Sequence, residues 1–152
     1  RKQRVTQAIE EVGLSHAAHL FPAALSGGMA QRVSLARILA RNPEIWLLDE
    51  PFSALDPVTH TEMQNLLREL IRRHKASAIF VTHDIDEALI VSDRAILIGN
   101  RPGHQIGEWM LNQPYPRHDA LLEMNNERVE ILQTLRNAHS HKQQVDTVEF
   151  VI

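Results

Sequence analysis

The stretch ALSGGMAQRVSLARILA, residues 24–40, places two adjacent glycines at the start of a predicted helix. Ser26 is a suitable N-cap for this helix. The first turn of a helix carries unsatisfied N–H groups and a partial positive charge, so it attracts anions. Gly27 and Gly28 lack side chains that would keep a phosphate away. The pattern favours an anion-binding helix start, although a flexible helix cap explains the same residues.

The composition is that of an ordinary globular domain. Of 152 residues, 43% are hydrophobic and 23% are charged, and the formal net charge is −3. This balance argues against nucleic acid as a partner, and no apolar run approaches the roughly 18 residues that a membrane helix needs. The chain has no cysteine, which excludes disulfides, thiolate metal sites and a catalytic thiol. It begins with Arg1 inside an amphipathic stretch, so we expect a part of a longer chain.

Apolar runs and helical patterns alternate along the chain, which predicts an α/β doubly wound fold with its site at the carboxyl ends of the strands. A first helix is expected over 1–12 and stops at Gly13. The expected strands are 44–50, 77–83, 94–99 and, after a turn at 101–103, an edge strand over 104–111. A helix is expected to start at Asp56-Pro57, with Asp56 as its cap and Pro57 as its first residue. Further helices are expected after Asp84 with a D-x-x-E start and over 119–138, and the last dozen residues are expected to be frayed.

Two adjacent carboxylates, Asp49 and Glu50, end the first strand directly after an apolar run. Burying charge beside such a run is costly unless something compensates it, and Mg²⁺ is a natural compensation because it takes one or two carboxylates together with phosphate oxygens. Adjacent strand residues point to opposite faces, so one carboxylate could serve the metal and the other a water. The alternative is an acidic pair that caps the next helix.

His83 ends the neighbouring strand. Its imidazole could bind a phosphate oxygen, or hold Glu50 and a water in place. The alternative is a partly exposed polar residue without a role. His139 and His141 are two positions apart in the predicted tail, and we do not expect a metal site there.

Several short motifs follow one another in a fixed order and at close spacing, and together they resemble the ATP-binding subunit of an ABC transporter. The match covers about residues 1–110. The stretch 82–103 is most similar to importers for nitrate, sulfonate and taurine. Met29 is a departure, since many members carry Gln there. The matching motifs are the signature sequence with Leu25–Met29 and Gln31-Arg32, the Walker B strand with Trp46–Pro51, the D-loop with Ser53–Asp56, and the switch histidine with Thr82–Asp84.

The resemblance assigns catalytic roles to three of these residues. It implies ATP and Mg²⁺ as cofactors, with Asp49 on the Mg²⁺ side and Glu50 as the general base for the attacking water. His83 is implied to sense the γ-phosphate and to stabilise the transition state. Phosphoryl transfer of this kind depends on positioning and charge neutralisation.

The resemblance also implies a head-to-tail dimer. Ser26, Gly27 and Gly28 would grip the γ-phosphate of ATP bound to the opposite subunit, and Asp56 would form a contact across the dimer. The further partners implied are a transmembrane permease and, indirectly, a solute-binding protein, with the subunit peripheral on the cytoplasmic face of the membrane.

The implied fold is a P-loop NTPase-like partial parallel sheet flanked by helices. Residues 1–24 would end the ABC helical subdomain, 25–111 would form an ATPase core lacking the P-loop, and 112–152 a C-terminal helix and tail. A P-loop needs G-x-x-x-x-G-K-[S/T], and no glycine of this chain precedes a lysine. We therefore expect that the complete protein hydrolyses ATP and that these 152 residues alone do not.

Two alternatives to a transport ATPase remain open at this point. One is a non-transport ATPase of the same family that acts on DNA or the ribosome, although such proteins usually add coiled coils or a second cassette. The other is a truncated, non-catalytic remnant.

Overall fold

The chain folds as two compact units. The computed structural model describes residues 1–53, 55–99, 103–140 and 149–151. The first unit consists of Arg1–Trp46 and Pro51–Ala78, and the second of Leu47–Glu50 and Ile79–Ile152.

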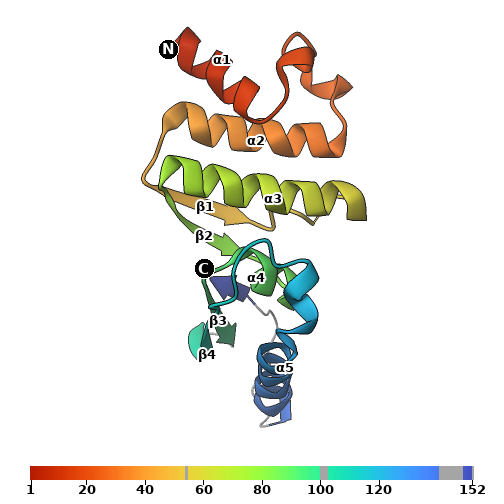
Figure 1. Ribbon diagram of the computed structural model, residues 1–152, viewed down its shortest axis with the longest axis vertical. Helices are drawn as coiled ribbons and strands as arrows, with labels where there is room; N and C mark the ends of the chain where they lie inside the picture. The colour runs from red at the N-terminus through yellow and green to blue at the C-terminus, as the bar shows by residue number, and fades with distance from the viewer. Residues whose placement is uncertain (54, 100–102, 141–148, 152) are drawn as a thin grey trace. The chain divides into compact units, whose positions relative to one another are not determined.

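Helices dominate the first unit, as Figure 1 shows. The predicted first helix is confirmed, and it ends before Gly13, whose φ of 73° is in the left-handed region that glycine adopts without strain. The helices are α1 Lys2–Glu11, η1 Ser15–Ala17, η2 Pro22–Ala24, α2 Gly27–Arg41 and α3 Pro57–His74.

The predicted caps of α2 and α3 are confirmed. The Ser26 hydroxyl oxygen accepts a hydrogen bond from the Met29 N–H at 3.3 Å. Asp56 caps α3, whose first residue is Pro57, as expected for a ring that lacks an N–H donor. Each helix therefore begins directly after a residue whose side chain accepts from N–H groups of its first turn.

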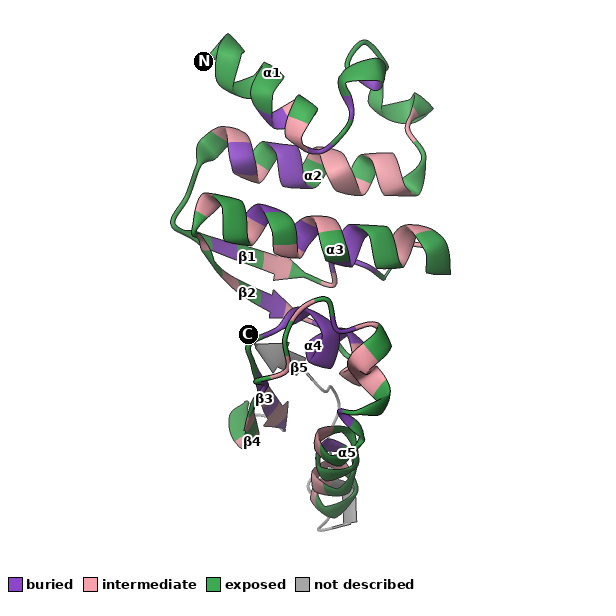
Figure 2. Ribbon diagram, viewed as in Figure 1, coloured by how far each residue is buried: buried purple, intermediate pink, exposed green. Residues whose placement is uncertain are grey.

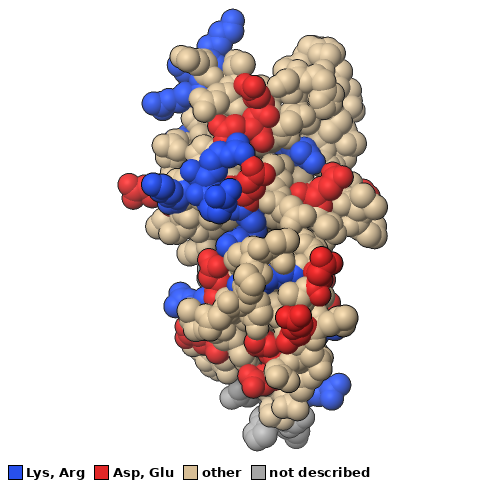
Figure 3. Space-filling view, in the orientation of Figure 1, with Lys and Arg blue, Asp and Glu red and all other residues tan. Residues whose placement is uncertain are grey.

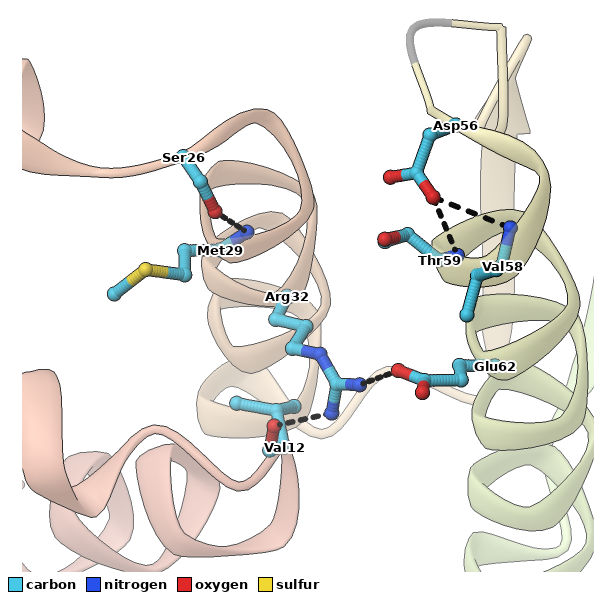
Figure 4. Close-up of polar contacts among 8 residues, drawn as sticks. All are labelled: Val12, Ser26, Met29, Arg32, Asp56, Val58, Thr59 and Glu62. Atoms are coloured by element: carbon cyan, nitrogen blue, oxygen red, sulfur yellow. Dashed lines mark hydrogen bonds and ion pairs between the residues drawn. The ribbon is translucent and has the colours of Figure 1, made fainter.

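Arg32 ties the helices of the first unit together (Figures 1 and 4). From α2, its Nη1 donates to the carbonyl oxygen of Val12 at 3.1 Å, just beyond α1. Its Nη2 donates to Glu62 Oε2 of α3 at 3.3 Å. One guanidinium thus holds α2 against both neighbouring helices.

A two-stranded sheet pairs β1 Ile45–Asp49 with β2 Ser77–Val81, which confirms the first two predicted strands. The Ser77 N–H donates to the Glu44 carbonyl at 3.0 Å, and the Glu50 N–H donates to the Val81 carbonyl at 2.9 Å. Both strands advance in the same direction between these two bonds, so the pair is parallel. Their carboxyl ends therefore lie at the same edge of the sheet.

Only one face of β1 is covered in the described structure (Figure 2). Trp46 is 2% exposed, whereas its neighbours Ile45 and Leu47 are 58% and 71% exposed. The continuous apolar run over 44–50 is typical of a strand covered on both faces, as in a parallel sheet, and this expectation is wrong for the described residues. The apolar run of β1 does have the composition of such a strand, but none of the described residues packs over the Ile45 and Leu47 side.

The second unit contains an antiparallel sheet that the sequence pattern did not predict. The strand over 94–99 was expected to extend a doubly wound sheet, but β3 instead lies between β4 and β5 and is antiparallel to both. The expected fraying is wrong for 149–151, which form β5, while the predicted turn at Arg101-Pro102 lies outside the described residues. The elements are α4 Ile85–Val91, β3 Arg94–Gly99, β4 His104–Met110, η3 Asp119–Leu122, α5 Asn125–Ser140 and β5 Glu149–Val151.

The core of the second unit forms around α4 and β3. Five of the seven residues of α4, from Glu87 to Val91, are buried, which makes it the most enclosed helix in Figure 2. Residues from β3 and α5 pack in the same cluster. The buried members of this cluster are Ala88, Leu89, Ala95, Leu97, Leu111, Met124 and Ile131.

Arg117 is buried in this unit, with only 2% of its surface exposed. Its guanidinium donates to the carbonyl oxygens of Leu89 at 3.1 Å and Leu111 at 2.7 Å, and to that of Ser92. Its Nε donates to the carbonyl oxygen of Gln113 at 2.7 Å. Arg117 therefore holds the carbonyl end of α4 against the segment that follows β4.

Acidic and basic side chains are interspersed on the face of the molecule in Figure 3. No helix among the described residues is both long enough and apolar enough to cross a membrane.

We predict that Arg117→Lys lowers the free energy of unfolding by about 2–4 kcal/mol, because lysine cannot reach four carbonyl groups with a planar fork and leaves some of them buried and unpaired. Chemical denaturation checks this. Arg94→Lys is the matched control, since Arg94 makes an exposed ion pair with Glu108, and it should change stability by less than about 1 kcal/mol. Equal effects of the two substitutions would contradict the prediction.

Candidate active site

Two polar residues meet at the carboxyl edge of the parallel sheet. Glu50 follows β1, and His83 lies two residues beyond the end of β2. The Glu50 Oε1 and His83 Nδ1 atoms are 2.6 Å apart, a short hydrogen bond between a carboxylate and an imidazole. Of the two contacts that the sequence suggested for His83, the one to Glu50 is present.

The backbone of Glu50 is in an uncommon conformation. Its φ is 45°, in the left-handed region, where a residue other than glycine costs about 1–3 kcal/mol. Asn42 and Lys75 share this conformation, but each of them caps the end of a helix. Glu50 instead turns the chain at the end of a strand, where its N–H bond to Val81 restrains it. The sequence contains no signal for this turn.

The pKa of His83 is raised above its ordinary value. The hydrogen bond to Glu50 is the largest cause, and the negative charge of Glu50 is the next. The charges of Glu87 and Asp84 act in the same direction. Because the His83 side chain is 70% exposed, solvent screens much of this effect. The pair therefore favours a protonated imidazole beside an ionised carboxylate.

Asp49 lies exposed at the end of β1, and the Glu50 side chain is 34% exposed. The argument that these carboxylates are buried and need a cation to compensate them is therefore wrong for this structure. Among the described residues, no group of His, Asp and Glu could hold a metal ion by protein ligands alone. A single exposed carboxylate still fits Mg²⁺, which completes its shell with phosphate oxygens and waters.

The first turn of α2 is exposed at Gly27 and closely packed at Gly28. A Cβ atom added to Gly28 would lie 2.6 Å from Thr59 Cγ2, a distance that real side chains do not reach. The sequence indicated that both glycines make room for an anion. The structure adds that Gly28 also makes room for α3.

Asp56 caps α3 by accepting from the N–H groups of Val58 and Thr59, each at 3.2 Å (Figure 4). Its pKa is lowered, first by a hydrogen bond from the Thr59 side chain and then by the Thr59 N–H. Ala54, in the same predicted loop, lies outside the described residues. Asp56 belongs to the first unit, as do Ser26 and the glycines, whereas Asp49, Glu50 and His83 belong to the second.

Sequence reasoning missed one contact of the signature helix. The Gln31 Nε2 atom of α2 donates to the carbonyl oxygen of Pro51, which follows Glu50 in the chain. The partners are separated by 20 positions, so no local pattern predicts the bond. The motif that contains Gln31 is the only signal that could have indicated it.

We predict that Gly28→Ala lowers the free energy of unfolding by about 1–3 kcal/mol, because its methyl group forces α2 and α3 apart. Adding Thr59→Ser, which removes Cγ2 and keeps the hydroxyl, should restore most of this loss. Denaturation of the two single variants and the double variant measures the coupling. Gly27→Ala, at an exposed position of the same turn, is the control and should cause no such loss. Failure of Thr59→Ser to compensate would contradict the packing role.

We predict that Glu50→Gln lowers the pKa of His83 towards the ordinary histidine value. Because the folded-state pKa of His83 is raised, the pair stabilises the fold fully at pH values below the ordinary histidine pKa. This contribution is lost as the pH rises through the raised value. NMR titration of the His83 ring carbons measures both forms. The same titration in Glu123→Gln, an exposed carboxylate elsewhere, should match the wild type. An unchanged pKa in Glu50→Gln would refute the assignment.

A family model described as ABC transporter matches residues 1–53. An aliphatic sulfonates import ATP-binding protein, SsuB 2 of Pseudomonas syringae pv. tomato, is 53% identical over 78% of this chain and 52% of its own length. SsuB 1 of Pseudomonas syringae pv. syringae is 49% identical over 89% of this chain and 57% of its own length. SsuB 1 of Xanthomonas axonopodis pv. citri is 46% identical over 90% of this chain and 55% of its own length.

Two solved structures share the fold. One is an inward-facing putative metal-chelate type ABC transporter, with a TM-score of 0.58 and 32% identity over 60% of this chain and 37% of the other. The second is an ATP-binding cassette of an ABC transporter in its ADP conformation, with a TM-score of 0.56 and 26% identity over 60% of this chain and 36% of the other.

The chain spans about half the length of the curated relatives that it matches. The matched family model covers residues 1–53, which include the motifs at residues 25–29 and 46–51. The chain belongs to the ATP-binding subunits of ABC transporters.

Proposed function

We propose that the whole protein is the ATP-hydrolysing subunit of an importer for aliphatic sulfonates. The observation that carries this proposal is the 2.6 Å contact between Glu50 Oε1 and His83 Nδ1 at the carboxyl edge of a parallel sheet. The reaction class is supported by the family, and the substrate class by relatives that are named as aliphatic sulfonates import proteins.

In this proposal Glu50 is the general base. Its carboxylate accepts a proton from the water that attacks the γ-phosphorus, and the bond from that phosphorus to the bridging oxygen of ADP breaks. His83 donates a hydrogen bond to the γ-phosphate as its charge redistributes. The raised pKa of His83 supports this role, because it favours the cationic ring.

Asp49 is the proposed Mg²⁺-side carboxylate. When bound, the ion would neutralise charge on the phosphate oxygens. Asp49 is exposed at the strand end, where a hydrated cation can approach it, and it contributes a single negatively charged ligand.

The first turn of α2 is the proposed contact to ATP held by a second ATP-binding subunit. Ser26 caps this turn and keeps its hydroxyl proton available for donation, while Gly27 and Gly28 leave the backbone N–H groups open. Asp56 is proposed to lie at the same dimer interface. Its lowered pKa supports a carboxylate that stays ionised there.

The remaining partners are a transmembrane permease and, indirectly, a solute-binding protein, with the subunit at the cytoplasmic face of the membrane. The proposed division of the chain is 1–24 for the end of the helical subdomain, 25–111 for the ATPase core and 112–152 for the C-terminal part. Relatives that are named as import ATP-binding proteins support this assembly.

We predict that Glu50→Gln in the whole protein lowers kcat for ATP hydrolysis by about 10²–10⁴-fold while ATP binding persists, because the amide cannot accept the proton from water. Phosphate release from the assembled importer measures kcat, and equilibrium dialysis with labelled ATP measures binding. Glu123→Gln is the matched control and should retain wild-type turnover.

Survival of turnover in Glu50→Gln would show that Glu50 is not the base. The substrate class has its own measurement, the uptake of a labelled aliphatic sulfonate into vesicles that contain the complete importer. Uptake of nitrate in place of the sulfonate would contradict the proposed cargo and leave the ATPase assignment intact.

A further inference from the structure

Thr82, the residue before His83, is completely buried. Its hydroxyl oxygen accepts a hydrogen bond from the Asp84 N–H at 3.1 Å. The same hydroxyl donates to the Glu87 carboxylate in the first turn of α4. One hydroxyl group thus joins the residues on both sides of His83 to the helix that follows.

Glu87 differs from what its sequence pattern indicates. A D-x-x-E start predicts a capping box, in which the Glu87 carboxylate would accept from the Asp84 N–H. That N–H instead donates to Thr82, and the Glu87 carboxylate accepts from the Thr82 hydroxyl. Asp84 keeps its part of the cap, since its Oδ1 accepts from the N–H groups of Asp86 at 2.8 Å and Glu87 at 3.2 Å.

The burial of Glu87 makes its contact with Thr82 informative. Glu87 is 6% exposed, and a carboxylate at such a position is costly unless hydrogen bonds satisfy it. A leucine would fill the same space without this cost. The hydrogen bond from the Thr82 hydroxyl requires a carboxylate acceptor at this position, which a leucine would not provide.

His83 itself is held in a different way. Its side chain is 70% exposed, so packing restrains the ring little, and the direction of the ring depends on the backbone that carries it. The contact with Glu50 is only 2.6 Å long, and a displacement of about 1 Å at the His83 backbone would break it. The backbone on each side of His83 is the part that Thr82 restrains.

We propose that the Thr82 hydroxyl and the Glu87 carboxylate are positioning groups that hold the His83 backbone so that its ring meets Glu50. This inference rests on the proposed ATPase function for its consequence in turnover, but the contact itself exists without nucleotide. The charged groups around the ring, Glu50, Glu87 and Asp84, all favour its protonated form, so the arrangement also stabilises the pair electrostatically.

The test compares Thr82→Val, which keeps the shape of the side chain and removes the hydroxyl, with Thr82→Ser, which keeps the hydroxyl. NMR titration of His83 in the nucleotide-free whole protein is the first measurement. Thr82→Val should shift the pKa of His83 down towards the ordinary value, and Thr82→Ser should keep it raised. ATP turnover is the second measurement. Thr82→Val should lower kcat by about ten- to a hundredfold with little change in KM, and Thr82→Ser should retain most of kcat.

Glu87→Leu is the second variant, in case Thr82→Val does not fold. It leaves the buried Thr82 hydroxyl without this acceptor, at a cost that is below the usual stability of a folded domain, so the variant is expected to fold. It removes the acceptor of the Thr82 hydroxyl and should lower kcat. Because it also removes a charge that raises the pKa of His83, a lowered pKa in this variant alone does not count as support for positioning. Thr134→Val is the matched control, since its hydroxyl bonds only within α5, to the Glu130 carbonyl, and both measurements should match the wild type.

The two measurements separate the two proposals. A wild-type protein without ATP turnover would refute the proposed function, and the His83 titration would still decide the positioning. An unchanged His83 pKa in both Thr82→Val and Glu87→Leu would overturn the positioning even if kcat fell. A lowered pKa that Thr82→Ser avoids would support it.

Discussion

The parallel pairing of β1 with β2 is the constraint on which the candidate site depends. Hydrogen bonds at the two ends of the pair, from Ser77 to Glu44 and from Glu50 to Val81, set its register. The register brings the residues that follow the two strands to one edge, where Glu50 reaches His83. The bond that closes the ladder also restrains the left-handed turn at Glu50. Strand pairing and side-chain placement are therefore consequences of the same few backbone contacts.

In the first unit, the first turns of α2 and α3 lie close together. Ser26 accepts from the Met29 N–H in the first turn of α2, and Asp56 accepts from the Val58 and Thr59 N–H groups in the first turn of α3. Gly28 then lets the two first turns approach to within the reach of Thr59. The absence of a side chain at Gly28 is therefore required by the packing of α2 against α3, in addition to the proposed contact with a phosphate.

Local chemistry decided which features the sequence could predict. The caps at Ser26 and Asp56 and the stop at Gly13 depend on neighbours within a few positions, so their residue types indicate them directly. The contact between Glu50 and His83 could be predicted from the sequence, because the carboxyl ends of two parallel strands lie at the same edge of a sheet. The partners of β3, the open face of β1 and the bond between Thr82 and Glu87 depend on packing between distant or competing groups, and no short pattern records them.

The left-handed backbone at Glu50 limits how this position can change over evolution. A substitution to glycine, asparagine or aspartate is compatible with a φ of 45°, because these residues enter that region at little cost. Valine, isoleucine and threonine would strain the chain at the end of β1. A related protein that loses the Glu50 carboxylate can therefore retain the strand pairing when the replacement is glycine or asparagine, and would strain it when the replacement is a β-branched residue. In such proteins, the carboxylate can be lost while the fold around the end of β1 is kept.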